Sequence, residues 1–312
     1  MRSIAVRISV QCTMKVRAFS SVSLAFLLGT APVRADRGAI PFHPAVTIFE
    51  PTQRALIAWN GQEEILILST DLRASRATKV LEVMPFPAEP RVAKGDVAVF
   101  KRAVRLINSK VSPPPPQALS RGFHTDASAL AAPPPGEITF HEKIGPHDVA
   151  VARVLNGEGF VEWVNTFLKR ASVDNPVIPP RLRRVVQEYL DDEFRWFAFD
   201  VVSLEDHFRT LEALQYRFAT PALFYPVKIS RSNQGQTSME LLVLTPRLLR
   251  NFTGIPLGQV QLRHDPLSLT SAELRSLDKG IDDLLGHRDD MKLRIWRIQG
   301  DFSSFDRDLI AR

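Results

Sequence analysis

The amino-acid sequence predicts an α+β fold, built from a mostly antiparallel sheet and several amphipathic helices. Short apolar runs that end at glycine or proline recur in groups along the chain, which is typical of strands. Between these groups, apolar residues recur every three or four positions, as on the buried face of a helix. Because strands and helices do not alternate regularly, a parallel α/β sheet is not expected. The elements form one extended unit or two lobes.

The first predicted elements are strands followed by a helix. Strands are expected at residues 54–59, 63–70 and 79–84. The first two flank Asn60-Gly61, a pair that favours the two left-handed residues of a type I′ hairpin turn. A helix follows, and its apolar face is formed by Val97, Phe100, Val104 and Ile107.

A proline-rich segment, residues 112–136, follows this helix. It contains Pro113–Pro116 and Pro133–Pro135 with alanine, serine and glycine between them, a composition that favours extended conformations and offers little to bury. We expect a long exposed loop or a linker here. The chain then comprises a β-rich lobe with one helix at residues 36–111 and an α+β lobe at residues 137–312.

The second half of the chain carries the same two patterns. Strands are expected at residues 137–142, 147–155, 196–202, 214–218, 239–244 and 292–298. Helices are expected around residues 160–168, after Pro179-Pro180 and after Thr270. Thr270 and Glu273 form a capping box, in which each side chain satisfies a backbone N–H at the start of the helix. Its apolar stripe is formed by Leu274, Leu277, Ile281, Leu284 and Leu285, and Gly286 ends it.

Residues 1–35 have the three parts of a secretory signal peptide. Positive charges precede an apolar run from Ala18 to Leu28, and Val33 and Ala35 are small residues at the positions that a signal peptidase reads. The apolar run is about half as long as the roughly 20 residues that a membrane span needs. We expect cleavage near Ala35, whether the chain starts at Met1 or Met14, and an exported protein that is periplasmic or extracellular. No transmembrane segment is expected in the mature chain.

Charge and cysteine content agree with this interpretation. The chain has 40 basic and 34 acidic residues, but five of its six net positive charges lie in residues 1–35. The remaining chain is close to neutral, so a nucleic-acid partner is not expected. The single cysteine, Cys12, also lies in the predicted signal peptide. The mature protein would have no thiol, which excludes disulfides and cysteine nucleophiles.

Several motifs occur in an order that resembles one protein family. They are Ile144-Gly145-Pro146-His147-Asp148-Val149, Trp163, Tyr189, the aromatic strand from Trp196, Pro221 and Tyr225-Pro226-Val227-Lys228-Ile229-Ser230. This order is similar to that of a family of exported bacterial proteins known only as a domain of unknown function. The resemblance covers most of residues 36–240 and implies export and a shared fold. It implies no catalytic residues, because the family has no established activity.

The best candidate site consists of His141, Glu142, His147 and Asp148. If residues 137–142 and 147–155 pair across the intervening turn, these side chains offer nitrogen and oxygen groups for a ligand, a metal or acid–base chemistry. Strand alternation sends the two members of each adjacent pair to opposite faces, so at most one residue of each pair shares a face. The alternative is that Asp148 caps the turn and the histidines are exposed to solvent. We assign no metal site and no cofactor.

Two further groups of residues are weaker candidates. A second polar cluster consists of Asp283, His287, Asp289 and Asp290. No metalloprotease, nucleophile-elbow, phosphate-loop or dinucleotide-binding motif occurs. Periodicity places the tryptophans in the core, although they could instead line an apolar or sugar-binding pocket; they are Trp59, Trp163, Trp196 and Trp296.

Two functions remain open. An apolar framework without a convergent nucleophile, base and oxyanion set indicates a non-catalytic exported module that binds a ligand, an envelope component or a partner protein. The alternative is a secreted hydrolase or metal-dependent enzyme that uses the region from His141 to Asp148. The two differ in whether His141 or Glu142 converges with His147 or Asp148 on a ligand-sized cleft.

Overall fold

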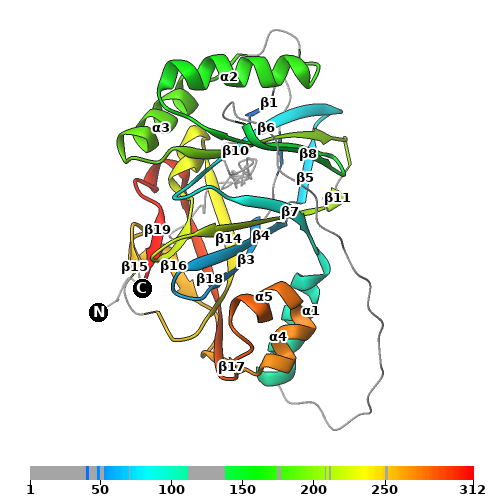
Figure 1. The fold of residues 1–312 in the computed structure, drawn as a ribbon, viewed down its shortest axis with the longest axis vertical. Helices are drawn as coiled ribbons and strands as arrows, with labels where there is room; N and C mark the ends of the chain where they lie inside the picture. Colours follow the sequence, from blue (N-terminus) through cyan, green and yellow to red (C-terminus); the bar gives the residue numbers. More distant parts are fainter. Residues whose placement is uncertain are drawn as a thin grey trace, which may run out of the picture. The chain divides into compact units, whose positions relative to one another are not determined.

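The strands of the protein belong mainly to two large sheets, seen in the computed structural model of Figure 1. The structure describes residues 40–41, 48–49, 53–69, 71–111, 138–173, 177–207, 209–210, 212–249 and 252–312. All of these residues lie in one unit of the chain, Pro32–Arg312. The predicted signal peptide with Cys12 and the proline-rich segment 112–136 lie outside the described residues.

The first large sheet has five strands, all paired antiparallel. In spatial order they are β1 (Ile40–Pro41), β6 (Thr78–Phe86), β10 (Trp196–Leu204), β9 (His147–Arg153) and β8 (Ile138–Ile144). The central strand β10 is the predicted aromatic strand. Its residue Phe199 lies opposite Val83 of β6 and Ala150 of β9.

The second large sheet has eight strands. In spatial order they are β16 (Val260–Leu262), β18 (Met291–Asp301), β14 (Gln236–Thr245), β3 (Gln53–Trp59), β4 (Glu63–Ser69), β12 (Ala213–Ala219) and β7 (Arg91–Gly95), with β17 (Leu267–Leu269) also paired to β18. Every pair is antiparallel except β14 with β3. Strands from before and after residues 112–136 contribute to both large sheets.

Two smaller sheets and short 3-10 helices complete the described structure. The small sheets are β11 (Arg209–Thr210) with β5 (Asp71–Ala74) and β2 (Ile48–Phe49), and β13 (Leu223–Tyr225) with β19 (Leu309–Ala311) and β15 (Phe252–Thr253). The 3-10 helices are η1 (Lys228–Ser232), η2 (Leu257–Gln259) and η3 (Phe302–Ser304).

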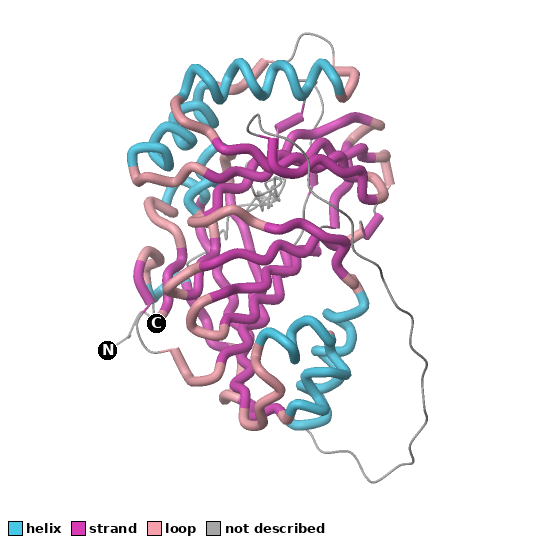
Figure 2. The backbone as a smooth tube through the Cα atoms, viewed as in Figure 1, coloured by secondary structure: helices cyan, strands magenta, loops and turns pink. Residues whose placement is uncertain are grey.

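Helices cover the outer faces of the two large sheets, which gives four layers (Figures 1 and 2). Helices α2 (Gly157–Arg170) and α3 (Pro180–Asp191) pack on the five-stranded sheet. Helices α1 (Ala98–Val111), α4 (Ser271–Leu277) and α5 (Lys279–Leu284) pack on the eight-stranded sheet.

Three apolar clusters hold these layers together. One lies between the sheets, and one lies under each layer of helices. Alternate residues of a strand enter different clusters, as Ile57 and Leu56 of β3 do, because successive side chains point to opposite faces. Both faces of each large sheet are therefore buried, which explains why the central strands read as continuous apolar runs. Each fully buried leucine, isoleucine or phenylalanine contributes about 1.5–3 kcal/mol of transfer free energy.

The structure confirms the mixed α+β class with mostly antiparallel sheets, and it corrects the predicted hairpin turn. Strands β3 and β4 pair as expected, with Trp59 opposite Glu64. Of the turn residues, Gly61 has a positive φ of 106°, but Asn60 does not. The loop instead has three residues, and the Asn60 side-chain oxygen accepts from the backbone N–H groups of Gln62 and Glu63, both at 2.8 Å. The type I′ prediction was wrong because the asparagine side chain closes the turn.

Two helix predictions are also corrected. In α1 the buried face contains Val99, Phe100, Ala103 and Ile107. Val97 and Val104 are exposed, so the predicted stripe was rotated from the true one. The predicted helix after Thr270 has its capping box, but it divides into α4 and α5 at Asp278, whose side chain caps α5 by accepting from the N–H of Ile281.

Candidate functional site

The predicted hairpin around Gly145-Pro146 is present, and it brings His141 and Asp148 into contact. Strand β8 pairs with β9, with His141 opposite Ala150 and Asp148 opposite Lys143, so His141 and Asp148 share a face. Their His141 Nε2 and Asp148 Oδ1 atoms are 2.7 Å apart. Because an ionised carboxylate can only accept, this contact requires a proton on Nε2, and in the neutral form of the ring Nδ1 is then an acceptor. Both side chains remain partly exposed, at 47% and 31%.

The other two predicted residues lie on the opposite face of the hairpin. Glu142 is exposed, while His147 is 2% exposed and points between the two large sheets. Its Nδ1 atom is 2.5 Å from Oδ2 of Asp200, and its Nε2 atom is 3.0 Å from the backbone oxygen of Glu212. The four predicted residues therefore form one surface pair, one buried histidine and one separate glutamate. Their roles in binding stay a prediction.

His147 belongs to a buried polar cluster within the core. Asp200 lies directly opposite Glu82 on the neighbouring strand, and both carboxylates are at most 5% exposed. Burial lowers the pKa of His147, but the charge of Asp200, its hydrogen bond and the charge of Glu82 outweigh this and raise it above its usual value. The imidazolium form compensates the buried carboxylates. This arrangement holds β6, β9 and β10 together and is closed to a ligand.

His141 lines a hollow beneath helix α2, on the outer face of the five-stranded sheet. The hollow has a volume of about 300 Å³, and its lining residues are His141, Ala150, Gly159, Glu162, Trp163, Thr166, Phe167 and Arg170. The volume is at the lower end of that usual for small-molecule sites. Helix α2 is held over the sheet by its apolar stripe, which contains Phe160, Val164, Phe167 and Leu168. Its first turn is fixed by Asn156, whose Oδ1 accepts from the N–H of Gly159 at 2.7 Å.

One wall of this hollow is aromatic. The ring of Trp163 stacks on Phe167 with centroids 5.1 Å apart and planes inclined by 20°, and it lies 4.2 Å from the ring of Phe199. Trp163 is only partly buried. It was predicted as a core residue and does pack against the core, but its position at the hollow was missed because helical spacing alone does not show where a cavity forms.

The rest of the rim is polar and mixed in charge. Glu162 and Arg170 are exposed, and neither makes an ion pair with any residue that the structure describes. The hydroxyl of Thr166 already donates to the backbone oxygen of Glu162 at 3.0 Å. The hollow thus offers a carboxylate, a guanidinium and the imidazole of His141 beside an aromatic wall. No serine or cysteine is among its lining residues, and its one hydroxyl group, that of Thr166, is already hydrogen-bonded.

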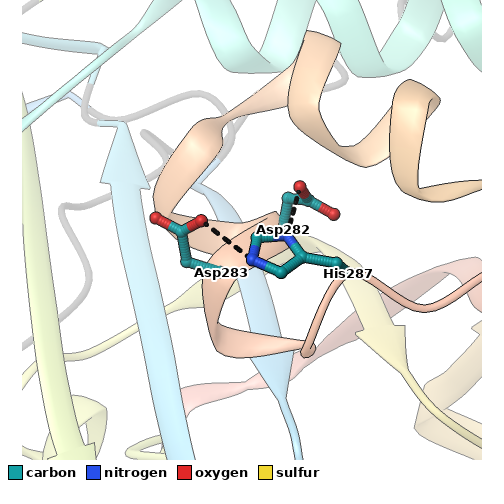
Figure 3. A group of neighbouring side chains, drawn as sticks. All are labelled: Asp282, Asp283 and His287. Carbon is teal, nitrogen blue, oxygen red and sulfur yellow. Dashed lines mark hydrogen bonds and ion pairs between the residues drawn. The ribbon is translucent and has the colours of Figure 1, made fainter.

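A second group, Asp282, Asp283 and His287, has the spacing of a metal site (Figure 3). Only Asp283 and His287 were in the predicted second cluster. The buried Asp282 accepts from Ser271 at 2.8 Å, from Arg275 at 3.0 Å and from Nδ1 of His287 at 2.8 Å. Burial acts to raise the pKa of Asp282, but these hydrogen bonds outweigh it and lower the pKa.

The donors around this group argue against a cation. Arg275 and Lys279 bring positive charge to the two carboxylates, with Lys279 Nζ 2.6 Å from Asp283. The carboxylate oxygens of Asp282 are already occupied by protein donors, and His287 has a positive φ of 53°, where the chain leaves α5. We conclude that the group links α4, α5 and the following loop.

The motif segment Tyr225–Ser230 also has a structural role. The Nζ atom of Lys228 is 2.6 Å from Asp192 and lies 4.1 Å from the centroid of the Tyr189 ring. The backbone N–H of Lys228 and the hydroxyl of Tyr189 both donate to Oδ1 of Asp308, at 2.9 Å and 2.6 Å. This network fastens α3 and η1 to the C-terminal part of the chain.

The fold and site together define a class: an α+β protein of two packed sheets between helices, with a small amphipathic hollow under one helix. The model of a bacterial family, described as "Uncharacterized protein conserved in bacteria (DUF2330)", matches residues 31–286. The chain belongs to this family. The match confirms the resemblance drawn from the motifs and extends beyond residue 240, to residue 286, just past α5.

Other comparisons give only distant likenesses. The crystal structure of baculovirus P35 is 12% identical with a TM-score of 0.38, over 88% of this chain and 94% of that chain. A mutated baculovirus P35 after caspase cleavage is 9% identical with a TM-score of 0.34, over 84% and 95%. No curated protein matches the sequence. Within the described ranges, no helix has the length and apolar character needed to cross a membrane.

Proposed function

We propose that the protein is an exported, non-catalytic binding protein that holds a small saccharide in the hollow under helix α2. The observation that carries this proposal is the combination of the partly exposed Trp163 with the unpaired polar groups of Glu162 and Arg170 around one hollow of about 300 Å³. This volume suits a ligand of one or two rings. The export part rests on the composition of residues 1–35.

The lining chemistry matches a sugar. An aromatic face accepts the C–H face of a sugar ring, while carboxylate, guanidinium and imidazole groups pair with its hydroxyls. Asp148 supports this role indirectly, because it orients the His141 ring and leaves Nδ1 as an acceptor for a ligand hydroxyl. The ligand would bridge the charged groups of Glu162 and Arg170.

Binding can be tested on the purified mature protein with a panel of probes. We expect glucose, galactose, N-acetylglucosamine or their β-linked dimers to give saturable binding in calorimetry and in ligand-observed NMR. Trp163→Ala and His141→Ala should weaken it at least tenfold. Glu142→Ala is the matched control, since Glu142 lies on the same strand but faces the other way. If no probe binds, or if the control loses as much affinity as His141→Ala, the proposal is wrong.

The second candidate is a hydrolase in which His141 acts as a general base. It is favoured by the 2.7 Å contact with Asp148, since a carboxylate on one ring nitrogen is the arrangement that orients a catalytic histidine. A saccharide or ester probe would then be turned over as well as bound. Product release that disappears in His141→Gln but persists in Glu142→Ala would favour this candidate over simple binding.

Export has a separate test. Mass spectrometry of the native protein from periplasm or medium should find a mature chain that begins just after Ala35. An intact N-terminal segment on protein from a cytosolic fraction would contradict export, and it would leave the binding proposal to be judged on its own test.

A further inference from the structure

We infer that a second hollow, between helix α3 and η1, binds a phosphate-bearing ligand through three arginines. The hollow has a volume of about 390 Å³ and is lined by Arg181, Arg184, Val185, Arg231, Asn233, Gln234, Gly235, Asp301 and Ser303. It shares no lining residue with the hollow near His141, so the inference does not depend on the proposed saccharide site.

The arginines come from two elements that the fold fixes against each other. Arg181 and Arg184 stand three positions apart on α3, so they lie on one face of that helix, and Arg231 belongs to η1. Helix α3 and η1 are joined by the Lys228 contacts with Asp192 and with the Tyr189 ring. The guanidinium groups therefore converge on the hollow because of buried contacts beneath them.

The acidic residues near these arginines already have partners. Glu188 pairs with Arg231 at 2.8 Å. Asp301 caps η3 by accepting from the backbone N–H of Ser303 at 2.9 Å and from its hydroxyl at 2.5 Å. Its other oxygen is 3.3 Å from the side-chain nitrogen of Gln236. The donors to Asp301 are neutral and leave its charge in place, so three arginines against Glu188 and Asp301 leave one net positive charge, which an anionic ligand would neutralise.

Two of the three arginines of α3, Arg181 and Arg184, have no carboxylate partner among the described residues. Arg184 makes no ion pair with any residue in the described ranges. The guanidinium of Arg181 is held by a neutral group, since the side-chain oxygen of Gln234, in the orientation that satisfies both, accepts from its two Nη atoms at 2.5 and 2.6 Å. Gln234 therefore positions the guanidinium of Arg181 without neutralising its charge.

The alternative is that these arginines are only the solvent-exposed face of α3. Comparison with the neighbouring Arg183 distinguishes the two interpretations. Arg183 is also exposed on α3, but it lines a separate and more open hollow next to α2, with a volume of about 960 Å³. The helix dipole does not account for arginines at this position, because positive charges near the start of a helix are unfavourable. The first turn of α3 also has no acidic residue to compensate them. Convergence on one hollow is a property of Arg181, Arg184 and Arg231, not of every arginine on the helix.

A phosphate group fits this arrangement better than a carboxylate. Guanidinium forks bind phosphate oxygens through paired N–H groups, and several forks can share the oxygens of one tetrahedral group. The hollow is larger than a single phosphate, so the ligand carries its phosphate on an organic group. That group comes either from a soluble phosphoester or from a phospholipid head group.

The test uses the full mature chain with two probes. Glycerol 3-phosphate represents the soluble source, and phosphatidylglycerol vesicles, compared with phosphatidylcholine vesicles, represent the lipid source. The variants are Arg181→Gln/Arg184→Gln, Arg184→Gln alone and the matched control Arg183→Gln. All three replace exposed side chains, and circular dichroism with a thermal melt checks that each variant folds.

We expect wild-type binding to at least one probe, a loss of at least tenfold in the double variant and a change of less than twofold in Arg183→Gln. Affinity should also fall between 50 and 200 mM salt. Binding to glycerol 3-phosphate assigns a soluble ligand, and specific binding to phosphatidylglycerol vesicles alone assigns a lipid head group. No binding to either probe, or an equal loss in Arg183→Gln, overturns the inference. His141→Ala should leave this binding unchanged, which separates it from the saccharide site.

Discussion

Asp308 is a buried carboxyl whose titration should appear in the stability of the whole fold. It accepts from the Tyr189 hydroxyl and from the backbone N–H of Lys228. Burial raises the pKa of Asp308 from 3.8 to about 6, although both hydrogen bonds and the Lys228 charge act in the opposite direction. A carboxyl whose pKa is higher in the folded chain favours folding below the unfolded value. This contribution is lost as the pH rises through the folded value.

The size of the effect follows from the shift. A difference of roughly two pKa units corresponds to about 3 kcal/mol, at about 1.36 kcal/mol per unit. Asp308→Asn removes the titration but keeps an oxygen that accepts from Tyr189 and Lys228. Part of this difference is already lost at pH 4, so between pH 4 and pH 7 we expect the unfolding free energy of the wild type to fall by about 2.4 kcal/mol relative to this variant. Urea denaturation followed by circular dichroism at each pH measures the difference.

The control is the exposed neighbour Asp306, whose replacement by asparagine should give a difference that changes little with pH. Comparison with a variant at each pH cancels the titration of the other carboxyls to first order. The quantity to follow is the unfolding free energy of the wild type minus that of Asp308→Asn. If this difference stays constant from pH 4 to pH 7, or increases in favour of the wild type, the reasoning is refuted.

Three further predictions test other buried positions. Burial raises the pKa of Glu64 well above its usual value, despite a hydrogen bond from the N–H of Phe224. Glu64→Gln should therefore become more stable relative to the wild type as the pH rises from 5 to 8. An equal difference in unfolding free energy at both pH values contradicts this. Because the pKa of His147 is raised, the stability that its charge contributes is complete below pH 6.5 and is lost at higher pH. The loss of unfolding free energy in His147→Asn, measured by urea denaturation, should therefore be larger at pH 5.5 than at pH 8.5. A loss that grows with pH argues against the ion pair. Gly254 has a φ of 96°, and a Cβ there would lie 1.9 Å from a backbone oxygen, so Gly254→Ala should cost more than about 1 kcal/mol in the same assay, while Gly258→Ala, at an open position, should cost less.

Elements were predicted correctly where the hydrophobic periodicity and the residues that begin or end a helix indicated the same boundaries. The α3 stripe from Leu182 to Leu190 is buried as expected, and the capping box at Thr270 is present. The parallel pairing of β14 with β3 could not be predicted, because the two strands lie far apart in the chain and both read simply as apolar runs. The α1 face was misplaced because Val97 and Val104 were taken for the buried stripe, whereas Val99 and Ala103 are buried beside Phe100 and Ile107.

The candidate site was predictable only in its local part. Contact between His141 and Asp148 follows from strand pairing across a short turn, so the sequence indicated it. The contribution of Trp163 depends on how α2 lies over the sheet, which is a tertiary property. Likewise, Arg184 and Arg231 look like separate solvated charges until η1 is placed beside α3.

The two helical layers differ in how they use charge, and this difference favours ligand binding on the α2–α3 side. On the α1–α4–α5 side the described charges are largely matched, with Lys110 2.8 Å from Glu273 and Arg275 3.0 Å from Asp282. On the α2–α3 side, Glu162, Arg170 and Arg184 face hollows without an ion pair to any described residue. Exposed ion pairs contribute little to stability, so their absence costs the fold little. Unpaired charges that converge on a hollow remain available to a ligand, whereas most of the charges of the opposite layer are already paired.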